Sequence, residues 1–91
     1  MENMIGSLVL SKTGRDANTI YLVFNQDKDY VYLVNGAAKK IANPKKKNIK
    51  HIQSLNYVSE AIKDKITTKS KVFDSEIFSC IKKFKNQIDI L

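Results

Sequence analysis

The sequence predicts a mainly β protein in which a small five-stranded barrel is followed by two C-terminal helices. The 91-residue chain has room for one small core. Its apolar residues alternate with a period of two up to about residue 52, and beyond that they recur at the three- and four-residue steps of a helix. Hydrophobic residues make up 43% and charged residues 27% of the chain, which is typical of globular rather than disordered proteins.

Short runs rich in β-branched and aromatic residues predict the strands. These runs form a meander over residues 5–10, 19–24, 30–34, 37–41 and 48–52. Asn35 and Gly36 follow the third run and favour a type I′ hairpin turn, so the fourth strand is expected at once. Pro44 then interrupts the sheet, because proline has no backbone N–H. Five strands this short leave an open sheet with too little core, and closure into a barrel is therefore expected.

Helical periodicity predicts two helices, near residues 57–66 and 75–89. Asn56 or Ser59 is placed to cap the first helix, and Asp74 or Ser75 the second. The sequence thus divides into a barrel over residues 1–53 and a helical extension over residues 54–91. This extension has too few apolar residues for a core of its own, so we expect it to pack on the barrel.

The sequence favours binding over catalysis. We find no Gly-rich phosphate loop, paired carboxylates or nucleophile triad, so no catalytic residue, cofactor or metal is expected. Cys80 is the only cysteine and is expected to be a small buried apolar residue, while the single histidine, His51, has no second ligand near it in sequence. No apolar run is long enough for a membrane span or signal peptide, which predicts a cytoplasmic protein, and a monomer is favoured.

The distribution of charge indicates a polyanionic partner. The formal net charge is +7, and residues 30–59 contain six lysines and no acidic residue. We interpret this window as a positively charged surface that neutralises phosphates, with an uninvolved solvated surface as the alternative. Lysine, as a point charge, predicts contact with the backbone of a nucleic acid rather than base recognition. The candidate residues are Lys39, Lys40, Lys45, Lys46, Lys47 and Lys50.

The loop between the first two strands adds candidates. Gly14 can adopt a positive φ and let a nucleic-acid backbone approach, and Lys12 and Arg15 on either side of it can donate hydrogen bonds to phosphate. Gly36 is a second glycine of this turn or backbone-approach type. Three tyrosines could stack on unpaired bases, although at least one of them is expected to cover the barrel end: Tyr21, Tyr30 and Tyr32.

Several of these residues together resemble the KOW motif of RNA-binding proteins related to ribosomal large-subunit proteins. The resemblance runs from about residue 5 to 52 and rests on Gly6, Val9, Gly14, Arg15, Asp16, Val34, Asn35, Gly36, Lys39 and Lys40. Gly14 matches the family's glycine and Arg15 its following basic residue. The run from residue 43 to 51 is similar to small stand-alone bacterial members, which also carry a short helical tail. One departure is Phe73, which stands three residues before Glu76 where those members have Thr or Ser.

This resemblance implies an SH3-like barrel that binds ribosomal RNA. We therefore expect a non-enzymatic, cytoplasmic RNA-binding protein, associated with the ribosome or translation, with ribosomal proteins as candidate further partners. The alternative is a protein-interaction module that contacts the transcription or translation machinery through the barrel and the C-terminal helices. Salt dependence separates the two, because phosphate contacts weaken steeply with salt and apolar helix contacts do not.

Overall fold

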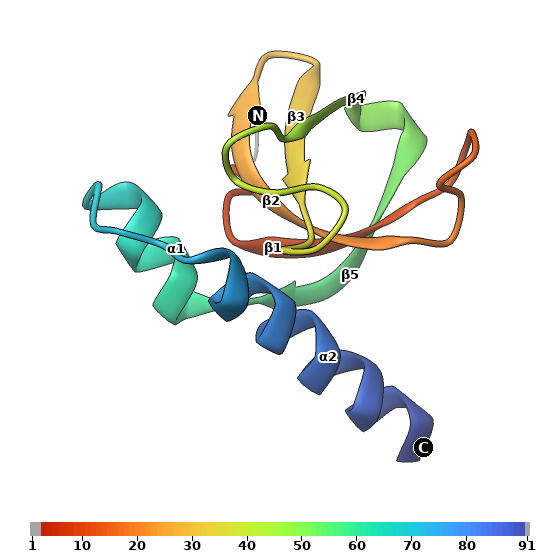
Figure 1. Ribbon diagram of the computed structural model, residues 1–91. Coiled ribbons are helices and arrows are strands. Elements are labelled where there is room, and N and C mark those ends of the chain that lie inside the picture. The colour runs from red at the N-terminus through yellow and green to blue at the C-terminus, as the bar shows by residue number, and fades with distance from the viewer. Residues whose placement is uncertain (1–2, 91) are drawn as a thin grey trace.

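The computed structural model describes residues 3–90 and shows a β-rich fold that ends in two helices (Figure 1). In chain order, its elements are β1 (Ser7–Ser11), β2 (Ile20–Asp27), β3 (Tyr30–Val34), β4 (Lys45–Asn48), the one-turn 3-10 helix η1 (Ile49–His51), β5 (Ile52–Val58), α1 (Glu60–Thr67) and α2 (Asp74–Ile90). The predicted mainly β class, with five strands before two helices, is confirmed. Within this range no helix has both the length and the apolar content to cross a membrane.

The five strands form one antiparallel sheet in the order β4–β3–β2–β1–β5. The sheet is strongly curved, so β4 and η1 lie above the loop that joins β1 to β2 (Figure 1). Within residues 3–90 no strand pairing joins the two edge strands β4 and β5. The expected closure into a barrel is therefore not confirmed.

Both faces of the central strands are buried. The inner face, against which Ile49 and Ile52 also pack, carries Val9, Tyr21, Val23, Val31 and Leu33. The outer face is covered by the two helices, and its cluster contains Leu8, Leu22 and Val34 with Ile62, Ile77 and Ile81. Burial of apolar area on both faces explains the consecutive apolar residues in β1 and in the first half of β2. Helices α1 and α2 thus pack on this face of the sheet.

The fourth strand lies elsewhere than predicted. Residues 37–41 belong to a ten-residue connection, and β4 is formed by the lysine run that follows Pro44. The prediction of a type I′ turn is also wrong. This turn needs a positive φ at both central residues, and Asn35 does not have one. Instead, its side-chain Oδ1 accepts hydrogen bonds from the backbone N–H groups of Ala37 and Lys39, at 3.0 and 2.9 Å. This local turn competes with a tight hairpin and opens a loop.

Gly36 lets that loop pack closely against α2. Its φ is +78°, and a Cβ built on it would overlap the carbonyl oxygen of Asp74 and lie 2.8 Å from the Phe78 nitrogen. The Asp74 carboxylate accepts a hydrogen bond from the backbone N–H of Ile41, with an Oδ1–N distance of 2.8 Å. The β3–β4 loop therefore packs on the first turns of α2, and the carboxylate expected to cap that helix holds the loop.

The final strand and the first helix are also displaced along the chain. The predicted strand at residues 48–52 is split by η1, because the Asn48 side chain accepts a hydrogen bond from the Lys50 N–H and caps a helical turn. The strand then continues to Val58, so α1 begins at Glu60 rather than at residue 57. Of the two expected caps, Ser59 is the one used: its hydroxyl accepts from the Ile62 N–H.

Candidate nucleic-acid interface

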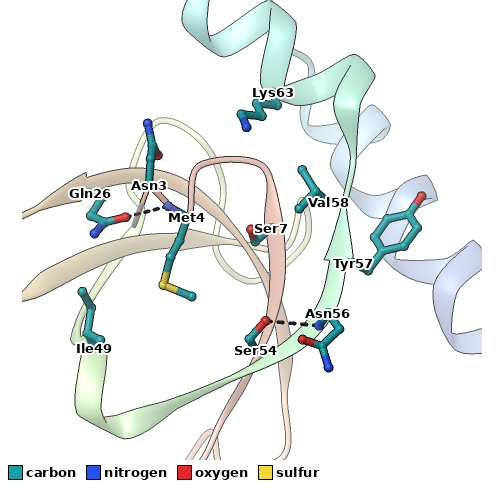
Figure 2. A pocket seen from close by; sticks show the side chains of 10 residues that line it. All are labelled: Asn3, Met4, Ser7, Gln26, Ile49, Ser54, Asn56, Tyr57, Val58 and Lys63. Atoms are coloured by element: carbon teal, nitrogen blue, oxygen red, sulfur yellow. Dashed lines mark hydrogen bonds between the residues drawn. The ribbon is translucent and has the colours of Figure 1, made fainter. Parts of the chain in front are cut away.

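One cleft of the molecule contains none of the predicted binding residues. It has a volume of about 690 Å³ and lies between the N-terminal segment, η1, the end of β5 and α1 (Figure 2). Met4 and Lys63 point toward it, whereas the Tyr57 ring is turned away. The described lining offers neither a carboxylate nor a histidine, and no cluster of three or more metal-ligating side chains exists in residues 3–90. The predicted cations lie elsewhere.

The β1–β2 loop lies beside the strand and turn that carry most of the lysine run. The backbone N–H of Lys12 donates to the His51 carbonyl at 2.9 Å, which joins the loop to η1. The Lys47 ammonium group in β4 donates to the Thr13 carbonyl at 2.8 Å. Segments more than thirty residues apart in sequence thus form one surface.

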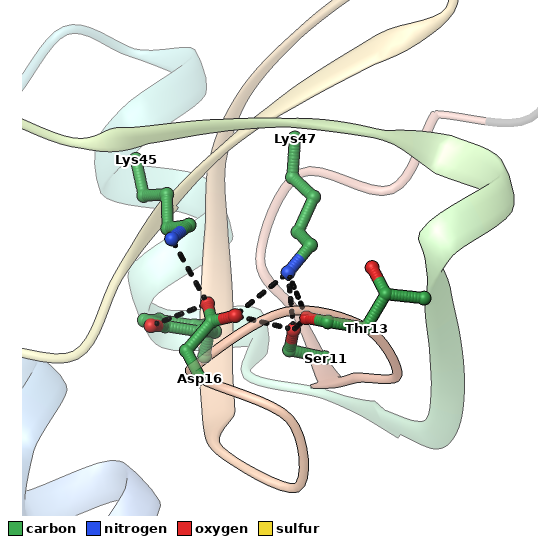
Figure 3. Close-up of polar contacts among 6 residues, drawn as sticks. Ser11, Thr13, Asp16, Lys45 and Lys47 are labelled. Carbon is green, nitrogen blue, oxygen red and sulfur yellow. Dashed lines mark hydrogen bonds and ion pairs between the residues drawn. The ribbon is translucent and has the colours of Figure 1, made fainter.

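Lys47 is a structural residue at the centre of this surface. Its ammonium group also donates to the Ser11 hydroxyl at 2.5 Å and to Asp16 Oδ1 at 2.8 Å (Figure 3), and its side chain is only 9% exposed. Lys47 is paired with Val31 in the sheet, so its side chain leaves the strand on the inner face and crosses to β1. In this structure the donors of Lys47 are used within the protein rather than presented to a ligand.

Asp16 joins the network from the other side. Its Oδ2 atom accepts a hydrogen bond from the Tyr21 hydroxyl at 2.9 Å and lies 3.4 Å from the Lys45 ammonium group. Burial alone would raise the pKa of Asp16, but hydrogen bonds from Lys47, Tyr21 and Ser11, together with the charge of Lys47, outweigh burial and hold that pKa well below its usual range. Asp16 is therefore ionised, and its charge is balanced locally.

The same contact removes Tyr21 from the candidates for base stacking. Its ring is only 3% exposed in the inner cluster. Burial, followed by the hydrogen bond and the charge of Asp16, raises the pKa of Tyr21 to about 12. The stacking prediction is wrong for Tyr21, because a buried ring whose hydroxyl is bonded inside the protein offers no face to a base.

The other two tyrosines lie on the outer face, as alternation predicts. Tyr30 is 40% exposed and Tyr32 is half-buried, while Val31 between them is buried. The Lys46 ammonium group lies 4.4 Å from the centre of the Tyr30 ring, and Lys46 is paired with Tyr32 in the sheet. Adjacent lysines of β4 therefore have different roles: Lys45 and Lys47 turn inward, and Lys46 turns outward.

The remaining predicted cations differ in exposure. Lys12, Arg15, Lys40, Lys46 and Lys50 are exposed, and Lys39 and Lys45 are partly buried. Gly14, between Lys12 and Arg15, is exposed with a φ of +82°. A Cβ at Gly14 would make only ordinary contacts with Asp16 and Lys47, so the positive φ, rather than close packing, calls for glycine there.

Sequence reasoning missed the anchoring residues Ser11, Thr13 and Asp16. A signal did exist, because Asp16 is the only acidic residue between residues 3 and 26 and stands in a basic loop. Its partner comes from a strand far along the chain, and that pairing depends on the register of β4.

A scan of known protein-family models finds no match to this chain, and a search of curated proteins finds no significant match either. The resemblance to the KOW motif therefore rests on the short motifs quoted from the sequence.

Proposed function

We propose that this protein binds RNA through the β1–β2 loop and the adjoining β4 and η1 segments. The proposal rests on the observation that the basic residues at this site have two different roles. Lys47 of β4 holds the loop through hydrogen bonds to Ser11, Thr13 and Asp16, while the side chains of Lys12 and Arg15 on the loop stay exposed. A loop held in one shape before binding loses little conformational entropy when it contacts phosphate.

The distribution of charge at this site supports a polyanionic ligand. Asp16 is the acidic residue of the loop, and Lys45 and Lys47 balance its charge. The exposed side chains of Lys12, Arg15, Lys46 and Lys50 then leave a net positive surface. Ammonium groups without base-reading partners suit phosphates, so we expect little sequence preference.

The assignment to the KOW family and to a particular RNA target is also part of this proposal. An SH3-like KOW barrel is supported by the positive φ of Gly14 and by a curved five-stranded sheet in which β5 pairs with β1. A ribosomal RNA target, a place on the ribosome next to ribosomal proteins, a cytoplasmic location and a monomeric state follow from the sequence and its resemblance to the KOW family.

Fluorescence anisotropy with a labelled single-stranded RNA tests the proposal. The exposed cations allow about three to five phosphate contacts, so log K should fall with log[salt] at a slope of about −2 to −4. The Lys12→Gln/Arg15→Gln double variant should weaken binding to every RNA and flatten the slope by about 1.4, at 0.7 per contact.

A matched control removes two charges elsewhere. Lys69 and Lys71 are exposed in the connection between α1 and α2, at the opposite end of the molecule from the β1–β2 loop (Figure 1). Lys69→Gln/Lys71→Gln should leave the slope nearly unchanged. Equal effects of the two double variants would refute a localised site, and salt-insensitive binding to a protein partner would favour the protein-interaction alternative.

A further inference from the structure

One side of α2 carries an exposed aromatic ring among lysines. Phe78 is 48% exposed although it lies in the half of the helix that packs on the sheet. Lys82 and Lys85 follow it at four and seven residues, so all three side chains share one side of the helix. Both lysines are exposed, and the last turns of α2 extend beyond the sheet (Figure 1).

The β3–β4 loop supplies two more cations to this side. Gly36 lies directly against the backbone of Phe78, and Ile41 is hydrogen-bonded to Asp74 one turn earlier on α2. Lys39 and Lys40 lie between these two anchor points, so the loop holds them beside the start of the helix. We call Phe78, Lys82, Lys85, Lys39 and Lys40 the α2 surface.

Two acidic side chains that the structure describes at the start of α2 are already engaged. The Asp74 carboxylate accepts the Ile41 N–H, and Glu76 forms an ion pair with Lys65 at 2.9 Å. The α2 surface therefore presents an aromatic face within a positive field. This combination fits a chain of alternating anionic and planar aromatic groups.

The α2 surface is also continuous with the site proposed above. The loop that carries Lys39 and Lys40 leads through Pro44 into β4, where the Lys45 ammonium group lies 3.4 Å from Asp16 of the β1–β2 loop. A single strand that leaves the β1–β2 loop can follow this segment to α2. This continuity favours RNA over an acidic protein.

We propose that the α2 surface binds an unpaired segment of RNA, with one base stacked on Phe78 and the flanking phosphates on the lysines. This inference rests on the proposed function and makes it specific: the ligand includes single-stranded nucleotides, and α2 belongs to the binding surface.

The absence of tryptophan from the sequence allows a direct test. In the full-length Phe78→Trp variant, the fluorescence of the introduced indole should be quenched when a 12-nucleotide oligo(U) saturates the protein. Phe73→Trp is the matched control, because Phe73 is 52% exposed and lies just before α2. The control should show no quenching, and equal quenching of the two variants would overturn the inference.

Affinity supplies an independent measurement. Phe78→Leu keeps an apolar side chain but removes the ring, and should weaken oligo(U) binding roughly five- to a hundredfold with an unchanged salt slope, whereas Phe73→Leu should not. Lys82→Gln should lower the slope by about 0.7, and Lys83→Gln, on a different side of the helix, should leave it unchanged.

The outcomes separate this inference from the proposed function. If oligo(U) binding depends on Lys12 and Arg15 but not on Phe78, the α2 surface is excluded and the RNA site on the β1–β2 loop stands. If a duplex of equal phosphate number binds as well as oligo(U), the single-strand assignment is wrong. Phe78-dependent binding of poly-glutamate as tight as that of oligo(U) would assign the surface to an acidic protein, and no RNA binding by the unmodified protein would refute both proposals.

Discussion

Replacing Lys47 with methionine should destabilise the protein substantially, although the replaced residue belongs to a lysine run. The side chain is 9% exposed, and its ammonium group makes three hydrogen bonds, to Ser11, Thr13 and Asp16. Removing one partner of a fully buried ion pair costs about 3–5 kcal/mol. In the Lys47→Met variant, Asp16 still has the Lys45 ammonium group and the Tyr21 hydroxyl as partners. We therefore expect the free energy of unfolding to fall by about 2–4 kcal/mol. This is a large share of the roughly 5–14 kcal/mol available to a domain of this size.

Urea denaturation followed by far-UV circular dichroism measures the effect. Lys46→Met is the matched control, since Lys46 is the next residue of β4 but points outward; it should change the free energy of unfolding by less than ~1 kcal/mol. In a double-mutant cycle, Asp16→Asn/Lys47→Met should be less destabilised than the sum of the single variants, by about 1 kcal/mol or more. Equal stability of the Lys46 and Lys47 variants would show that the network contributes nothing to the fold.

Three further predictions concern stability and reactivity. Gly14→Ala should lower the free energy of unfolding by about 1 kcal/mol, because alanine is strained at the positive φ of this position. Gly36→Ala should lower it by roughly 3 kcal/mol, because the added Cβ would also overlap the backbone of α2. A lower melting temperature for Gly14→Ala than for Gly36→Ala would contradict this order. Asp16 has a lowered pKa in the folded state and titrates near 3.9 when unfolded, so its contribution is complete above about pH 5 and is lost as the pH falls below about 4. The stability difference between the unmodified protein and Asp16→Asn should therefore shrink between pH 6 and pH 2, and a constant difference would refute the assigned pKa shift. Burial raises the pKa of Cys80 despite a hydrogen bond from Ser59 and the charge of Lys83, so a disulfide reagent at pH 8 should react more slowly with the folded than with the urea-unfolded protein; equal rates would place the thiol at the surface.

The parts of the fold that depend on local pattern were predictable. The alternation in β3 puts Tyr30 and Tyr32 on the opposite face from Val31 and Leu33, and the structure buries Val31 and Leu33. The three- and four-residue spacing places Ile77 and Ile81 on the buried side of α2. In both cases the periodicity of the apolar residues determines which side of the element is buried, because burial of apolar side chains is the main favourable contribution to the free energy of folding.

The errors occur where a distant partner overrides local preference. Asn35 and Gly36 favour a tight hairpin, yet Gly36 packs on α2, 38 or more residues later in the chain. Likewise, nothing in the composition of the lysine run distinguishes Lys46 from Lys47. Their roles follow from the register of β4 against β3, which also depends on Pro44 and on the turn at η1. The candidate site was thus predictable as a charged segment but not residue by residue.

The position of the lysine run at the edge of the sheet has a consequence for the behaviour of the protein in concentrated solution. An open strand edge can pair with the same edge of another copy, which is a common route to aggregation. β4 is only four residues long and follows a proline, and its exposed Lys46 would repel the same residue of a second copy brought edge to edge. At the other edge, the register of β5 against β1 shifts between Ser7 and Val9, and Asn56 has a φ of +57°, which interrupts a regular pairing edge. The short length of β4, its preceding proline and the exposed Lys46 therefore oppose edge-to-edge self-association of the free protein.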